Sequence, residues 1–75
     1  MPHLMKDLPG AEPVSVSGTP MGPPATLRAG SELRITVPMM HRPSQDFELY
    51  WSEIQVNGQL YRVSRRALDR ALSGG

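Results

Sequence analysis

The sequence contains no cysteine, and only four of its 75 residues are Phe, Tyr or Trp. The missing cysteines exclude disulfide bonds and thiolate metal sites. No apolar run approaches the roughly 20 residues that a membrane-spanning helix needs. Residues 1–10 also lack the basic start and continuous apolar stretch of a signal peptide. We therefore expect a soluble, cytoplasmic protein with no membrane partner.

The first third of the chain holds few residues that can build a core. Six of the eight prolines lie before residue 25, three glycines are interleaved with them, and the first aromatic residue is Phe47. Such a segment buries too little apolar surface to offset the entropy of ordering it. We predict a disordered Pro/Gly-rich arm over residues 1–25 and a small domain over residues 26–75. Val14 and Val16 alternate as in a short edge strand, which a closed barrel would need.

Two later stretches have the period of a strand. In residues 33–37 (LRITV) apolar and polar side chains alternate, and Pro38 is expected to end this strand. Residues 38–46 follow as a loop. Residues 47–56 predict a longer strand whose apolar phase changes midway. That change indicates either a β-bulge near Ser52 and Glu53 or a strand buried on both faces, as in a small barrel.

Asn57 and Gly58 form the strongest local signal in the chain. A type I′ hairpin turn needs positive φ at both central residues, and Asn-Gly adopts that conformation with little strain. A turn at this point sets Glu53 directly opposite Arg62, a favourable pair of charges across two strands. The sequence therefore predicts a hairpin of known register.

A short helix is predicted directly after the hairpin. Ser64 is a suitable N-cap, and Val63 with Leu68 forms a hydrophobic staple. Gly74 is expected to end the helix. An apolar stripe is predicted to dock on the sheet, and an arginine-rich face to point outward; the stripe contains Ala67, Leu68, Ala71 and Leu72.

These elements predict a mainly β fold with one C-terminal helix, in the α+β class. Three to five antiparallel strands would form a small sheet or a partly open, SH3-like barrel. Catalysis is not expected, because serines and threonines occur mainly in predicted loops and no acid–base constellation accompanies them. His3 and His41 have no partner at ligand spacing. We therefore expect no catalytic residues, no metal site and no cofactor.

Nucleic-acid binding is the alternative function. Residues 62–75 carry four arginines against one aspartate, and the two tyrosines and the tryptophan would lie close enough to stack on bases. The last eighteen or so residues resemble the wing and closing helix of excisionase-type winged-helix DNA-binding modules. The helix-turn-helix of those modules has no counterpart here. A net charge of +1 is also small for a protein that must neutralise several phosphates.

Protein binding is the favoured function, in a regulator or adaptor. An open sheet edge can pair with a partner strand or with a second copy of the chain, so self-association is a further alternative. Arginine and aromatic residues are enriched at interface hot spots, and methionines adapt to varied surfaces. The partner would contact the sheet edge, the loop 38–46 and the arginine-rich helix face. The candidate contact residues are Met39, Met40, His41, Arg42, Tyr50, Trp51, Tyr61, Arg62, Arg65, Arg66 and Arg70.

Overall fold

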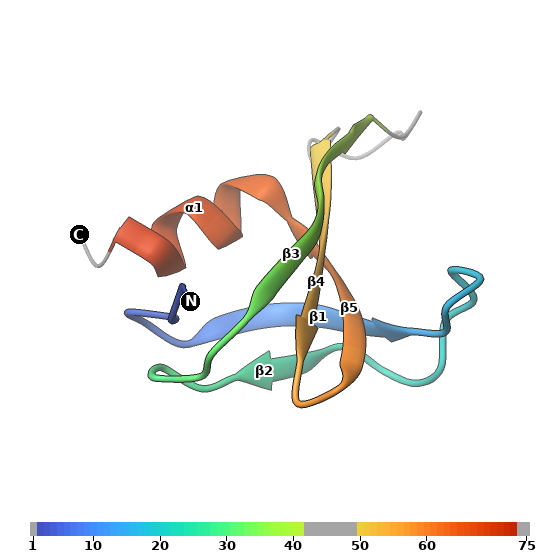
Figure 1. Cartoon of the computed structure of the whole chain (residues 1–75), viewed down its shortest axis with the longest axis horizontal. Coiled ribbons are helices and arrows are strands. Elements are labelled where there is room, and N and C mark those ends of the chain that lie inside the picture. Colours follow the sequence, from blue (N-terminus) through green and yellow to red (C-terminus); the bar gives the residue numbers. More distant parts are fainter. Residues whose placement is uncertain (1, 42–49, 74–75) are drawn as a thin grey trace.

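The computed structural model describes residues 2–41 and 50–73 of the chain. The strands make one open antiparallel sheet in the order β2-β1-β5-β4-β3. The mainly β fold with one C-terminal helix is therefore confirmed. The SH3-like barrel is not confirmed, since β2 and β3 are the two outer strands of an open sheet. In chain order the elements are β1 (Leu8–Val14), β2 (Ala25–Leu27), β3 (Arg34–His41), β4 (Tyr50–Val56), β5 (Gln59–Ser64) and α1 (Arg65–Ser73), as drawn in Figure 1.

The hairpin of β4 and β5 turns at Asn57 and Gly58, as predicted. Both residues have a positive φ, 51° and 81°, which fits a type I′ turn. The resulting register places Glu53 opposite Arg62, again as predicted. A two-residue signal in the sequence therefore fixes which side chains of these two strands face the core.

The predicted disordered arm is not confirmed, because residues 2–25 take part in the fold. They contribute β1 and the first residue of β2. Leu4, Leu8 and Ala11 from this segment are each at most 1 % exposed. A few apolar side chains of this segment, correctly spaced, join a core that later strands complete.

Two prolines fit within β1 because of where they lie in the ladder. Pro9 and Gly10 (φ 72°) lie in a β-bulge. β1 advances three residues, from Leu8 to Ala11, while β2 advances two. Pro13 has no N–H, but its carbonyl accepts a hydrogen bond from the N–H of Met21 at 2.9 Å. The N–H and C=O of one strand residue face the same side, so the missing donor faces the segment after β1. Pro13 therefore costs the ladder between β1 and β5 no hydrogen bond.

The predicted bulge near Ser52 and Glu53 on β4 is wrong. β4 keeps a simple alternation, in which every second residue from Ser52 to Val56 is buried. The irregularities lie on β3 instead, which has one extra residue directly after Ile35 and a second one before Met40. Bulges on β3 bend that strand along β4 while β4 keeps its inner face turned to the core.

β3 also runs further than predicted, because Pro38 does not end it. The strand continues to His41. The carbonyl of Pro38 accepts a hydrogen bond from Ser52 Oγ at 2.6 Å, which joins β3 to β4 at the irregular position. Residues 42–46 of the predicted loop and residues 47–49 of the predicted strand lie outside the described residues.

Helix α1 is held at both of its ends. The N–H of Ala67 donates to Ser64 Oγ at 3.3 Å, which confirms the predicted N-cap. The carbonyl of Ala71 accepts hydrogen bonds from the N–H groups of Met5, at 2.7 Å, and Lys6, at 3.3 Å. A nine-residue helix is too short to be stable alone, so these contacts and the core fix it. The predicted end at Gly74 lies outside the described residues.

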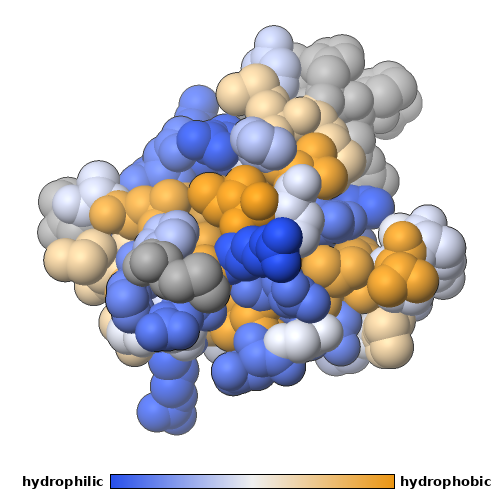
Figure 2. Space-filling view, viewed as in Figure 1, coloured by the Kyte–Doolittle hydropathy of each residue, from blue (hydrophilic) through white to orange (hydrophobic). Residues whose placement is uncertain are grey.

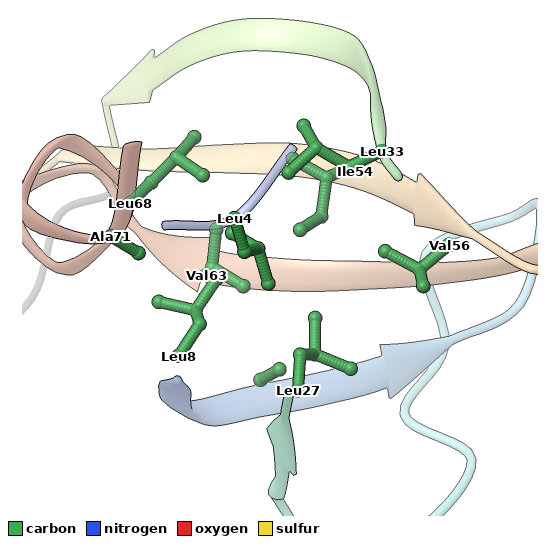
Figure 3. Packing of buried hydrophobic residues seen from close by; sticks show 10 residues of the cluster. Leu4, Leu8, Leu27, Leu33, Ile54, Val56, Val63, Leu68 and Ala71 are labelled. Carbon is green, nitrogen blue, oxygen red and sulfur yellow. The ribbon is translucent and has the colours of Figure 1, made fainter. Parts of the chain in front are cut away.

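The core lies between the sheet and α1, where side chains from strands, helix and N-terminal segment converge (Figure 3). The predicted apolar stripe of the helix is confirmed. Leu68 and Ala71 are buried, and Ala67 and Leu72 pack against the core from its margin. The buried cluster consists of Leu4, Leu8, Ala11, Leu27, Leu33, Ile54, Val56, Val63, Leu68 and Ala71.

Candidate interaction surface

The ends of β3 and β4 farthest from the Asn57-Gly58 turn carry five of the predicted contact residues. Met40 lies opposite Trp51, and Tyr50 lies opposite His41 in the ladder. Met39 is 56 % exposed and Tyr50 is 49 % exposed, whereas Met40 and Trp51 are half-buried. In Figure 1 these ends of β3 and β4 project beyond the start of α1. Large apolar side chains are therefore presented at one end of the sheet. Arg42 lies outside the described residues.

The start of α1 is bound to β3 through Arg65. Its Nη1 donates to the carbonyl of Pro38 at 2.8 Å, and its Nη2 lies 3.1 Å from Asp69 Oδ1 one helical turn later. The same Pro38 carbonyl accepts the hydroxyl of the fully buried Ser52. Arg65 therefore satisfies a carbonyl at the irregular part of β3. The prediction that its side chain belongs to a free, solvent-facing helix surface is wrong.

Arg62 is also used within the fold. Its side chain is only 16 % exposed, and its Nη1 lies 3.8 Å from Glu12 Oε1 on the neighbouring strand β1. Its Nη2 donates to the carbonyl of Gly18 at 3.3 Å. The carboxylate of Glu53, which the register sets opposite Arg62, accepts instead from Thr36 Oγ1 at 2.7 Å. Arg62 thus holds the segment after β1 against the sheet.

Tyr61 and Trp51 lie on opposite faces of the sheet. Tyr61 pairs with Ile54 in the ladder and packs against the buried cluster. Trp51 is an odd number of residues away from Ile54 along β4, and so belongs to the opposite face. The predicted stacking surface of Tyr50, Trp51 and Tyr61 is therefore not formed.

Arg66 and Arg70 lie on the exposed side of α1. Neither guanidinium has a hydrogen-bond or ion-pair partner among residues 2–41 and 50–73. Four residues apart on one helix, they are neighbours on its surface. Of the four arginines predicted at the hairpin–helix junction, Arg66 and Arg70 are the two whose guanidinium groups have no partner in the described part of the chain.

The acidic side chains of the described residues, by contrast, are all engaged within the fold. Asp69 is paired with Arg65 and Glu12 with Arg62, and Glu53 accepts from Thr36. In the N-terminal half, Asp7 Oδ1 accepts the N–H of Ala29 at 2.8 Å, and Glu32 lies 3.3 Å from His3.

Sequence reasoning missed a second set of exposed apolar side chains. Val16 is 94 % exposed and Met21 is 62 % exposed, both in the segment between β1 and β2. This segment is hydrogen-bonded: the N–H of Ser15 donates to the Thr19 carbonyl at 2.9 Å, and that of Gly18 to the Ser15 carbonyl at 2.8 Å. The signal in the sequence was the lack of any charged residue from 13 to 27. On the face drawn in Figure 2, apolar areas are likewise separated by hydrophilic ones.

A surface depression lies beside the Asn57-Gly58 turn. The depression has a volume of about 260 Å³, and its lining includes Arg34 at the start of β3, Gln55 of β4 and the two turn residues Asn57 and Gly58. It contains none of the predicted contact residues. Residues 2–41 and 50–73 hold no group of three His, Asp or Glu side chains arranged to bind a metal ion. Within the same residues, no helix has the length and apolar character needed to cross a membrane.

The strand–turn–strand–helix arrangement of β4, β5 and α1 agrees with the wing and closing helix that the last residues resemble. That likeness remains one of local layout, since the strands of the open sheet occupy the rest of the described chain. In comparisons with known proteins, no family model, no curated protein and no solved structure matches the chain.

Proposed function

We propose that this chain is a non-enzymatic protein-binding module that acts as a regulator or adaptor. The observation that carries this proposal is the junction where the exposed Met39 and Tyr50 lie near the start of α1, a helix whose Arg66 and Arg70 have no side-chain partner among residues 2–41 and 50–73. Methionine, tyrosine and arginine supply adaptable and aromatic contact area together with strong donors, the combination found at protein interfaces. The partner contacts this junction through side chains.

The edge of β3 contributes less than an unbroken edge strand would. β3 is an outer strand of the sheet, but its two irregularities interrupt the regular row of backbone groups that a partner strand needs. At the other edge, β2 has only three residues. We therefore place the partner at the end of β3, from Met39 to His41, rather than along its length. Self-association through paired edges is disfavoured for the same reason.

Nucleic-acid binding is less well supported than protein binding. Two of the four arginines at the hairpin–helix junction are committed to Glu12 and to the Pro38 carbonyl, and Tyr61 packs toward the core. Affinity for a duplex grows with the number of phosphates that are neutralised. Two unpaired arginines on one short helix provide few such contacts.

A photo-crosslinking side chain placed at Met39 tests the proposal. Met39 is exposed, so the replacement leaves the core intact. In the native cell we expect an adduct that is destroyed by protease and resists nuclease. The same group at Arg34, at the opposite end of β3, is the control and should give no such adduct. An adduct at Met39 that nuclease removes would contradict the proposal and favour the alternative.

A further inference from the structure

The described surface holds positive charges that the fold does not neutralise. Each described acidic side chain has a partner within the chain, as set out above. Four exposed arginines have no side-chain partner among residues 2–41 and 50–73: Arg28, Arg34, Arg66 and Arg70. Charges that are unpaired inside the molecule are available to a ligand of opposite sign.

Arg66 stands out among these four because its position opposes the local electrostatics. It lies in the first turn of α1, where the helix dipole favours negative charge, and that turn has no acidic residue. Its neighbour four residues later is Arg70, and like charges at that spacing repel. Arg65 occupies the same turn, but its charge is offset by Asp69 and the Pro38 carbonyl. For Arg66 the described fold provides no such offset. A carboxylate of a binding partner would offset both the unfavourable interaction with the helix dipole and the repulsion from Arg70.

Apolar contact area adjoins these charges. Arg65 contacts Pro38, and Ser64 lies opposite Trp51 in the ladder. Met39 follows Pro38, Arg66 follows Arg65, and Tyr50 precedes Trp51. All three residues therefore lie around the junction of β3, β4 and α1. We call Met39, Tyr50, Arg66 and Arg70 the junction surface. It combines two exposed apolar side chains with two unpaired positive charges.

We propose that the junction surface binds an acidic peptide segment of a partner protein that also carries an apolar side chain. Carboxylates of the segment contact Arg66 and Arg70, and its apolar side chain packs against Met39 and Tyr50. This inference rests on the proposed function and specifies the chemistry of the partner. Arginine suits this task, because its planar guanidinium pairs with a carboxylate through two parallel hydrogen bonds.

Selection from a library of random linear peptides, followed by titration of the selected peptides, tests the inference. We expect peptides enriched in Asp and Glu around Leu, Phe or Trp. Arg66→Glu should weaken their binding about tenfold or more, because a charge pair is turned into a repulsion. The same change should raise Tm by about 2–5 °C, since glutamate suits both the helix start and Arg70. Weaker binding by a more stable protein separates a contact residue from a folding defect.

Two further variants complete the experiment. Met39→Ser should weaken binding without changing the preference for acidic peptides, since it removes apolar contact area alone. Arg34→Glu is the matched control: it reverses another exposed arginine that has no side-chain partner among the described residues and lies outside the junction surface, and affinity should stay within about twofold.

The possible failures are distinguishable. Selected peptides without acidic residues, or an affinity that Arg66→Glu leaves unchanged, would overturn this inference and leave protein binding standing. Selection of no peptide above background would also overturn it. Duplex DNA or RNA binding in its place, with a salt dependence that falls in the Arg66→Glu variant, would overturn the proposed function as well.

Discussion

Arg65 and Arg66 are adjacent residues of the same type, yet only Arg65 is bound within the fold. The guanidinium of Arg65 reaches Pro38 and Asp69 because the helix turns that side toward the irregular part of β3. Arg66, 100° further around the helix, points to solvent. One arginine therefore stabilises the junction of helix and sheet, while the next has no structural partner in the described fold and is left for recognition.

Gly58 gives a prediction that concerns backbone conformation alone. Its φ is 81°, and a Cβ atom added there would meet no other atom within 4 Å. Gly58→Ala should therefore destabilise the protein by about 1 kcal/mol through backbone strain. Gly22→Ala is the control, because Gly22 has no positive φ and also offers space for a Cβ. Urea denaturation of both variants would decide; equal stabilities would show that the turn does not require glycine.

At the scale of elements, α1 depends on parts of the chain far from it in sequence. Its first turn is capped from β5, and its Ala71 carbonyl is bound by the N–H groups of Met5 and Lys6. Leu4, directly before them, is 1 % exposed and belongs to the same core cluster as Leu68. The N-terminal segment is thus a structural support of the C-terminal helix.

Leu4→Ala tests that support. Removing a fully buried leucine side chain typically costs about 2–5 kcal/mol, and here the loss should reduce the stability of the whole domain, helix included. Met5→Ala is the control, since Met5 is 62 % exposed and its N–H group is retained. Circular dichroism during urea denaturation would report the effect. Similar stabilities for the two variants would show that the N-terminal segment is not part of the core.

The elements predicted correctly are those that short-range signals determine. Asn57-Gly58 fixes the hairpin, and Ser64 marks the start of α1. The sequence suggested only a short edge strand at Val14 and Val16, whereas β1 covers Leu8–Val14. Its extent was not predictable, because tolerance of Pro9 and Pro13 depends on which neighbour each backbone group faces, and composition does not contain that information. The extension of β3 past Pro38 was missed for the same reason.

The candidate site was predictable to a similar extent. Met39 and Tyr50 were predicted as contact residues, and both side chains are exposed. The separate roles of the arginines were not predictable, because they depend on long-range partners. Glu12 on β1 binds Arg62, and the Pro38 carbonyl on β3 binds Arg65. A helix pattern by itself cannot distinguish a bound guanidinium from a free one.

At the scale of the whole molecule, the sheet is assembled from both ends of the chain. β1 lies between β2 and β5, so the N-terminal strand pairs directly with the last strand. Three residues of the ten in the buried cluster, Leu4, Leu8 and Ala11, come from the first 25 residues. We therefore expect the chain to unfold as one cooperative unit.

A fragment of residues 26–75 tests this expectation. Without β1 it would expose the edge of β5 and lose part of the core, so it should show no cooperative thermal transition. The full chain, followed by Trp51 fluorescence and by far-ultraviolet circular dichroism, should give coincident transitions. A fragment with a sharp transition of its own would instead support a separate domain over residues 26–75.

The hydrogen bonds from Met5 and Lys6 to Ala71 have a consequence for how the domain connects to other chains. They bring residues that are more than 60 positions apart in sequence into contact, and Figure 1 shows the start of β1 and the end of α1 on the same side of the molecule. A polypeptide can therefore enter and leave this domain at nearly one point. We therefore expect the fold to suit insertion into a loop of a host protein and to tolerate circular permutation. Met39 and Tyr50, at the ends of β3 and β4 away from the Asn57-Gly58 turn, would stay accessible.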